Sequence, residues 1–189
     1  MPISVRPLAL PEIVEIIPVI HCDERGFFSE TYNQVDMAAN GIAIDWLQDN
    51  QSLSASKGVL RGLHFQIPPV AQDKLVRVVK GSILDVAVDI RKGSPGFGKW
   101  VCLEVSAKKW NQILVPKGFA HGFVTLEPET EVLYKVSAPY SREHDRCIRF
   151  DDPAIGIDWG LGGQEPILSA KDANAPLLSD IDTGFVHEN

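Results

Sequence analysis

Residues 75–91, LVRVVKGSILDVAVDIR, decide the fold class of this chain. Side chains of a β-strand alternate between its two faces, so a pattern of period two indicates a strand. One face of the second half carries Leu84, Val86, Val88 and Ile90, and the other carries Asp85, Ala87, Asp89 and Arg91. The pair Lys80-Gly81 separates the two apolar runs, where a tight turn is expected. The stretch therefore predicts two strands joined as a hairpin.

Strand-like runs of the same kind recur along the chain, about every 8 to 12 residues, with Gly, Pro, Asn or Ser between them. They are residues 15–21, 27–33, 46–53, 58–65, 99–106, 111–116, 121–126, 130–137 and 146–150. Helix signals are few: 34–40, between a capping Asn33 and Gly41, and one turn within 169–176. This spacing predicts an all-β fold, an antiparallel jelly roll or small barrel with few short helices, in a single domain over 1–189.

Composition and charge exclude several classes of function. The 189 residues are 44% hydrophobic and 23% charged, which is ordinary for a globular domain. The net charge of −7 argues against nucleic acid and against an anionic membrane as partners. No apolar run approaches the roughly 20 residues of a membrane span. The N-terminal stretch is broken by prolines and acidic residues, so a cytoplasmic location is expected.

The chain has three cysteines, an odd number without C-x-x-C spacing: Cys22, Cys102 and Cys147. This pattern favours reduced thiols over a disulfide framework or a zinc site. Because free cysteine is among the most buried residue types, we expect these side chains to behave as small apolar groups.

Two further stretches carry the chemistry. GVLRGLH (58–64) places Arg61 and His64 on an apolar strand, and VPKGFAHGF (115–123) contains P-x-G-x-x-H, which resembles the second signature of the cupin jelly rolls. Metal-binding cupins add an H-x-H and a glutamate from an earlier hairpin. Here Gln66 takes the second histidine position, and Lys74 lies where a carboxylate is needed. Since a cation repels a divalent metal, the sequence predicts a cupin-like fold without a metal site.

Six segments along the chain carry a resemblance to a known family, and they are 23–32, 48–69, 72–95, 115–123, 132–141 and 167–178. Together they resemble the dTDP-4-dehydrorhamnose 3,5-epimerase family over roughly residues 5–178. The resemblance implies inversion of C3 and C5 of dTDP-4-dehydro-6-deoxyglucose through an enolate, with no redox cofactor or metal. Such a reaction needs a base, an acid on the opposite face, and a positive group at the developing oxyanion.

The resemblance also implies roles for individual residues. His64 is the expected base, Asp172 orients it, Tyr134 is the general acid, and Lys74 stabilises the enolate. Expected substrate-binding residues are Arg25, Phe28, Glu30, Gln48, Asp49, Asn50, Arg61, His121, Asp145 and Lys171. Many family members supply the first part of this set from the partner subunit, so we expect a homodimer. The family often has glutamate at the position of Asp145, and Glu143 lies nearby as a second candidate.

Each of these residues also has an ordinary structural interpretation when it is taken alone. His64 is typical of a structural histidine on a strand, and His121 of a remnant of the cupin metal site. Tyr134 fits a half-buried strand aromatic, and Lys74 an edge cation. Asp172 lies three residues after Ser169, which is the spacing of a helix-capping pair.

Other functions stay open at the level of sequence. They are an epimerase acting only at C3 or only at C5, a 3,4-ketoisomerase on a related nucleotide sugar, a metal-dependent cupin and a non-catalytic sugar-binding cupin. One local prediction concerns Gly62: residues 61 and 64 would face opposite ways on a regular strand, so we expect a bulge at Gly62 that turns both toward one pocket.

Overall fold

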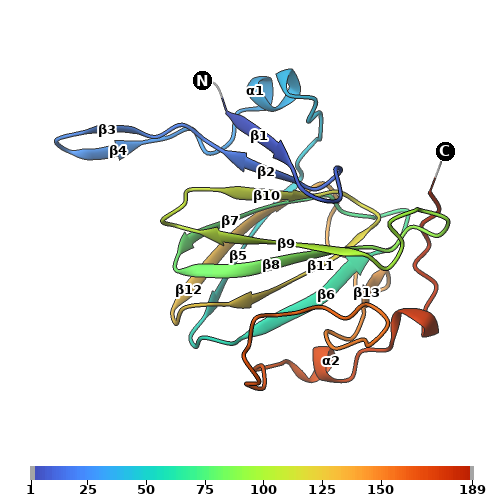
Figure 1. Cartoon of the computed structure of the whole chain (residues 1–189). Helices are drawn as coiled ribbons and strands as arrows, with labels where there is room; N and C mark the ends of the chain where they lie inside the picture. The colour runs from blue at the N-terminus through green and yellow to red at the C-terminus, as the bar shows by residue number, and fades with distance from the viewer. Residues whose placement is uncertain (1–2, 188–189) are drawn as a thin grey trace.

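Two antiparallel β-sheets packed face to face form the body of this protein in a computed structural model that describes residues 3–187 (Figure 1). The first sheet has the spatial order β1 (Ser4–Pro7), β2 (Val14–Ile17), β10 (Gln112–Val115), β7 (Lys74–Lys80), β12 (Thr130–Val136) and β5 (Gln48–Ser54). The second has the order β13 (Asp145–Cys147), β6 (Leu60–Gln66), β11 (Phe119–Thr125), β8 (Ser82–Asp89) and β9 (Trp100–Ser106). This arrangement confirms the predicted antiparallel jelly roll.

The turn at Gly81 connects the two sheets, and the predicted hairpin is wrong. β7 and β8 end and begin at this turn as expected, with Gly81 at φ +80°. However, β7 pairs with β10 and β12, whereas β8 pairs with β11 and β9. Alternation and a tight turn identify two strands, but they do not specify which strands pair. Both faces of β8 are covered, and the turn at Gly81 carries the chain from one sheet of the sandwich to the other.

β8 is buried on both sides. Val86 and Val88 pack outward in a cluster with Ile148 and Trp159 of the C-terminal segment, which runs beneath the five-stranded sheet (Figure 1). Ile83 and Ala87 pack inward against residues of the six-stranded sheet. Asp85 and Asp89 share the inward face and are fully buried. The polar half of the predicted pattern therefore points into the interior, where each carboxylate needs a partner.

Two short α-helices, α1 (Gln34–Ala39) and α2 (Ala170–Ala173), and a 3₁₀ turn, η1 (Leu178–Asp180), complete the described range. The Asn33 side chain caps α1 by accepting from the backbone N–H groups of Val35 and Asp36. Ser169 caps α2 in the same way through the N–H of Asp172. Both helices lie where the sequence predicted them. Neither they nor the 3₁₀ turn, within residues 3–187, is long and apolar enough to cross a membrane.

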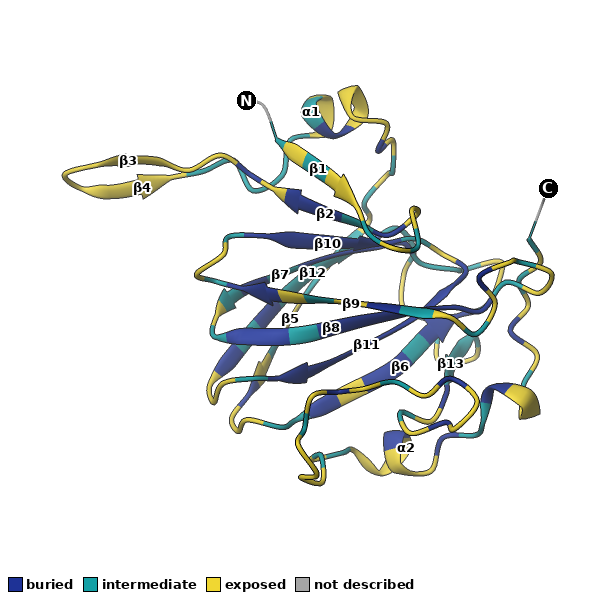
Figure 2. Cartoon of the chain, viewed as in Figure 1, coloured by how far each residue is buried: buried dark blue, intermediate teal, exposed yellow. Residues whose placement is uncertain are grey.

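A two-stranded arm, β3 (His21–Asp23) and β4 (Gly26–Phe28), projects away from the body and is exposed along its length (Figures 1 and 2). The strand predicted over 27–33 therefore ends at Phe28. The three cysteines are free thiols, but Cys22 and Cys102 are exposed and Cys147 is half-buried. The expectation of buried cysteines is wrong for Cys22 because it lies on this arm, and for Cys102 because it lies on the outer strand β9.

Candidate active site

Two adjoining cavities of about 300 Å³ each open between the sheets and share His64, Lys74 and Tyr134. The outer cavity is also lined by Gln48, Asn50, Phe65, Gln66, Gln72, Tyr140, Asp145 and Lys171. The inner one is also lined by Ser52, Arg61, His121, Phe123, Ser169 and Asp172. Each is within the size range of small-molecule sites. The fold thus brings together ten of the fourteen residues expected to act in catalysis or binding.

A bulge on β6 places Arg61 and His64 on the same side. His64 pairs with His121 and Arg61 with Phe123, so two residues of β6 oppose the single Gly122 of β11. Gly62 has φ +134°, and a Cβ atom there would lie 2.5 Å from the Gly122 Cα. Only glycine fits this position. The predicted bulge is confirmed, and both side chains line the inner cavity.

His64 is held by a buried carboxylate. Its Nε2 lies 2.5 Å from Asp172 Oδ1, and the Asp172 side chain is 4% exposed. Burial raises the pKa of Asp172, but hydrogen bonding to His64 and Ser169 and the charges of His64 and Lys171 outweigh it, so the pKa lies below its usual value. An ionised carboxylate only accepts hydrogen bonds, so Nε2 carries the ring proton. In the neutral form of the ring, Nδ1 is the nitrogen without a proton and can act as a base.

Tyr134 reaches the cavity from β12, in the sheet opposite His64. Burial raises the pKa of its phenol, and the positive charge of Arg61 partly offsets this rise. The hydroxyl is therefore protonated at neutral pH and can donate a proton. Arg61 itself is fixed by the Ser54 hydroxyl at 3.3 Å and the Leu53 carbonyl at 3.2 Å. Its positive charge favours the ionised form of the Tyr134 phenol.

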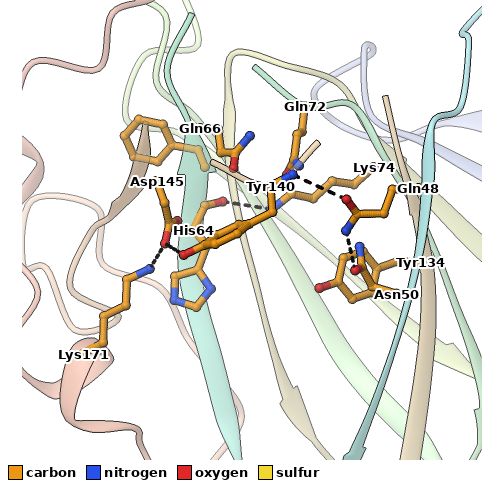
Figure 3. A pocket seen from close by; sticks show the side chains of 11 residues that line it. Gln48, Asn50, His64, Gln66, Gln72, Lys74, Tyr134, Tyr140, Asp145 and Lys171 are labelled. Carbon is orange, nitrogen blue, oxygen red and sulfur yellow. Dashed lines mark hydrogen bonds and ion pairs between the residues drawn. The ribbon is translucent and has the colours of Figure 1, made fainter. Parts of the chain in front are cut away.

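Lys74 is buried and lines both cavities. Burial lowers the pKa of its amine to about 8, while the charges of Asp85 and Asp145 act in the opposite direction. The ammonium therefore predominates at pH 7. Its Nζ donates to the His64 carbonyl at 3.2 Å (Figure 3). A lysine has three N–H donors, so others are available for a ligand oxygen. The interpretation of Lys74 as a surface edge cation is wrong.

His121 and Gln66, at the positions compared with cupin metal ligands, are hydrogen-bonded to other groups of the chain. Buried His121 contacts both oxygens of Asp85, from Nε2 at 2.8 and 3.0 Å. Gln66 donates to the carbonyls of Val70 and Pro139 and accepts from the Ser141 N–H. In residues 3–187 no three His, Cys, Asp or Glu side chains come close enough together to hold a metal ion.

Polar side chains surround the mouth of the outer cavity (Figure 3). Lys171 donates to Asp145 Oδ2 at 2.5 Å, and the Tyr140 hydroxyl donates to the same oxygen at 3.3 Å. Gln48 donates to Asn50 Oδ1 at 2.7 Å and accepts from the Tyr140 backbone N–H at 3.4 Å. Tyr140 is 60% exposed. The mouth therefore combines amides, one ion pair and an open aromatic ring, which suits a polar ligand with a planar base.

Four predicted binding residues lie outside these cavities. Arg25, Phe28 and Glu30 belong to the arm or the segment after it, and Arg25 pairs with Asp23 of its own arm at 2.5 Å. Asp49 pairs with Lys135 at 2.9 Å and lines a hollow on the other side of the six-stranded sheet. Its side chain does not contact this site because neighbouring residues of β5 face opposite ways.

Several lining residues were not predicted from the sequence, and they include Ser52, Phe65, Gln66, Gln72, Phe123, Tyr140 and Ser169. Ser52 and Ser169 had a usable signal. Ser52 continues the alternation of Gln48 and Asn50, and Ser169 precedes Asp172 by three residues. Tyr140 had no local signal, because it reaches the mouth through a loop that contacts β5 and β13.

Known proteins resemble this chain over nearly its whole length. Residues 7–180 match the family model described as dTDP-4-dehydrorhamnose 3,5-epimerase. A dTDP-4-dehydrorhamnose 3,5-epimerase of Sinorhizobium fredii is 48% identical over 180 residues, which are 95% of this chain and 92% of that relative. The crystal structure of a dTDP-6-deoxy-D-glucose-3,5-epimerase from Legionella pneumophila in complex with dTDP-4-keto-L-rhamnose has a TM-score of 0.94 and 42% identity. That match covers 99% of this chain and 100% of the other.

A more distant structural neighbour has a narrower activity. It is a 3'-monoepimerase from Streptomyces bikiniensis in complex with dTDP-quinovose, with a TM-score of 0.85 and 34% identity. The match covers 92% of this chain and 87% of the neighbour. The family match, the relatives and the shared fold lead to one conclusion: this chain belongs to the dTDP-4-dehydrorhamnose 3,5-epimerase family, whose members are isomerases that bind dTDP-sugars.

Proposed function

We propose that this chain inverts C3 and C5 of dTDP-4-dehydro-6-deoxy-D-glucose to give dTDP-4-dehydro-L-rhamnose, with His64 as base and Tyr134 as acid. The observation that carries the proposal is their placement: His64 lies on β6 and Tyr134 on β12, so the two groups line the shared cavities from opposite sheets. Inversion requires a proton to leave one face of a carbon and another to arrive on the opposite face.

The base step uses His64 Nδ1. The C4 ketone of the sugar acidifies the hydrogens on C3 and C5, and Nδ1 removes one of them while Asp172 holds the Nε2–H. The bonding electrons pass into the carbonyl and form an enolate. Lys74 neutralises the developing oxygen charge, and the buried setting strengthens that interaction. Tyr134 then protonates the same carbon from the opposite face, with Arg61 stabilising its phenolate.

Residues at the mouth suit the nucleotide portion. The exposed ring of Tyr140 can stack on thymine, and the amides of Gln48 and Asn50 can hydrogen-bond polar edges. Lys171 supplies a positive charge, with Asp145 as its partner. His121, in the inner cavity, is suited to a sugar hydroxyl. Glu143 is not among the residues that line either cavity, which favours Asp145 as the acidic contact.

Deuterium exchange tests this function directly. The protein is incubated with dTDP-4-dehydro-6-deoxy-D-glucose in D₂O, and deuterium at C3 and at C5 is followed separately by NMR. We expect deuterium at both carbons together with the inverted product. Absence of exchange at both carbons would overturn the proposal, and migration of the ketone to C3 would favour a 3,4-ketoisomerase.

The second candidate is an epimerase that inverts a single centre. The likeness to a 3'-monoepimerase favours it. The 3,5-epimerase is preferred because the relative from Sinorhizobium fredii is more similar to this chain, at 48% against 34% identity. Deuterium at C3 with a C5 centre that keeps its configuration would establish the narrower activity.

We further propose a homodimer in which the arm of each copy supplies Arg25, Phe28 and Glu30 to the site of the other. The arm projects from the body, and Phe27 and Phe28 are each 61% exposed, which is typical of apolar surface that a partner covers. Arg25 can bind a phosphate through two parallel hydrogen bonds.

Complementation tests the shared site. Arg25→Ala and His64→Ala chains are each expected to be impaired alone. When the two chains assort at random, half of the dimers are mixed, and each mixed dimer has one intact site of its two. The co-expressed mixture should therefore recover about a quarter of wild-type activity. A mixture no more active than its components, or a fully active monomer in sedimentation, would contradict the proposal.

We also propose a domain organisation, a class of partner and a location. We expect one domain over 1–189, of which residues 1–2 and 188–189 lie outside the described range. The net charge of −7 supports the absence of nucleic acid and of membrane lipid as partners. The nucleotide-sugar substrate supports a cytoplasmic location.

A further inference from the structure

The cap of α2 contacts the same aspartate that holds His64. Ser169 has the extended backbone of a helix cap, with φ −73° and ψ 158°. Its hydroxyl accepts a hydrogen bond from the Asp172 backbone N–H at 3.1 Å. The same hydroxyl donates to Asp172 Oδ2 at 2.9 Å. One serine side chain therefore holds both the main chain and the carboxylate of Asp172.

These bonds give the two carboxylate oxygens of Asp172 separate partners. Oδ1 contacts His64 Nε2 at 2.5 Å, and Oδ2 accepts from Ser169. The terminal torsion of an aspartate has a broad energy well, so a carboxylate held at one oxygen can still rotate. The second bond fixes the plane of the carboxylate. It also satisfies an acceptor on a residue that is only 3% exposed.

α2 depends on such contacts because it is a single turn of four residues, far shorter than a helix that is stable alone. Lys171 connects it to Asp145 of β13, and Asp172 connects it to His64 of β6. Without its cap, the turn that carries Asp172 loses the bond at its N-terminal end. The position of the carboxylate relative to β6 therefore depends on Ser169.

We propose that Ser169 is a positioning residue for the epimerase reaction, which aims the Asp172 carboxylate at His64 through the hydrogen bond that it donates to Oδ2. This inference rests on the proposed function of His64 as the base. The 169–172 spacing then has two roles, because the residues that cap the turn are also the residues that hold His64 in place. Ser169 acts through Asp172, so its loss should affect turnover more than substrate affinity.

Three variants separate the capping of the turn from the support of the carboxylate: Ser169→Ala, Ser169→Thr and Ser169→Gly. Alanine loses both bonds, and we expect kcat to fall about 10- to 100-fold, the usual worth of a hydrogen bond to a charged group. KM for dTDP-4-dehydro-6-deoxy-D-glucose should stay within about two-fold of the wild-type value, because the lost hydrogen bonds are not made to the substrate. Threonine keeps both bonds and should restore kcat to within about three-fold of wild type.

The glycine variant is the decisive one. Glycine is tolerated well at a helix cap although it has no side chain, so the turn stays nearly as stable, but glycine cannot donate to Oδ2. We expect Ser169→Gly to melt near the wild type and to lose about as much kcat as Ser169→Ala. Wild-type turnover in Ser169→Gly would show that the serine only caps the turn and would overturn the inference.

A matched control lies on β9. The Ser106 hydroxyl accepts from the Lys109 backbone N–H at 3.0 Å, with the same spacing of three residues, and Ser106 lines neither cavity. Ser106→Ala should leave kcat unchanged. Wild-type exchange of deuterium is measured in the same series. If the wild type fails to exchange, the proposed function fails; if the wild type and Ser169→Ala are equally active, only the role of Ser169 fails.

Discussion

Replacing Tyr134 by phenylalanine removes one oxygen atom from the site and keeps the ring. Tyr134 lines both cavities and its ring stays in place in the variant, so we expect loss of the hydroxyl to change the free energy of unfolding by less than about 1 kcal/mol. The effect on chemistry should be much larger. A positioned general acid contributes about 10²–10⁴ in rate, which corresponds to about 3–5 kcal/mol in the activation free energy.

The variant should separate two events that the wild type couples. His64 and Asp172 remain in place, so proton removal and return on the same face should continue and bring deuterium into the recovered substrate. Net inversion should fall by about 10²–10⁴ because no group remains on the opposite wall to deliver a proton. Exchange and inversion are measured by NMR on one sample in D₂O, and stability is measured by urea unfolding.

Tyr32→Phe is the matched control, because Tyr32 is also a partly buried tyrosine whose pKa is raised by burial, and it lines neither catalytic cavity. It should leave both exchange and inversion unchanged. If Tyr134→Phe inverts both centres at nearly the wild-type rate, the two-wall mechanism is wrong for this protein.

Further predictions concern the base, the pH profile, the bulge and metals. His64→Ala should abolish both inversion and exchange while circular dichroism shows that the protein stays folded; surviving exchange would contradict its role as base. Burial lowers the pKa of Lys74 to about 8, so the ammonium predominates below that pH and kcat/KM should fall as the pH rises through 8. A flat profile to about pH 9.5 would exclude the role of the Lys74 ammonium. Gly62→Ala should lower the free energy of unfolding by about 2–4 kcal/mol, because its Cβ would meet the Gly122 backbone at 2.5 Å. Gly93→Ala, at φ +81° with nothing within 4 Å, should lower it by about 1 kcal/mol in the same urea titration. Dialysis against EDTA should leave turnover unchanged; loss restored by one divalent ion would point to a metal-dependent cupin.

Much of the site was predictable because its residues lie in short motifs on regular strands. His64, Lys74 and Tyr134 were assigned from three separate segments, and the fold brings all three to the same two cavities. The bulge followed from local geometry, since residues three apart face one side of a strand only when an extra residue is inserted. Asp49 shows the limit of motif matching, because the alternation of β5 turns it away from its neighbours Gln48 and Asn50.

By itself, the sequence determined most element types, the turn at Gly81 and which titratable side chains the strands carry. These are local properties, set by alternation, backbone freedom and side-chain chemistry. Only the tertiary structure decided that the Gly81 turn crosses between sheets, that Asp85 faces inward to His121, and that Tyr140 lines the mouth. Strand pairing and cavity lining depend on contacts between residues far apart in the chain. The same alternating pattern is compatible with several partners, and packing of the whole core selects one of them.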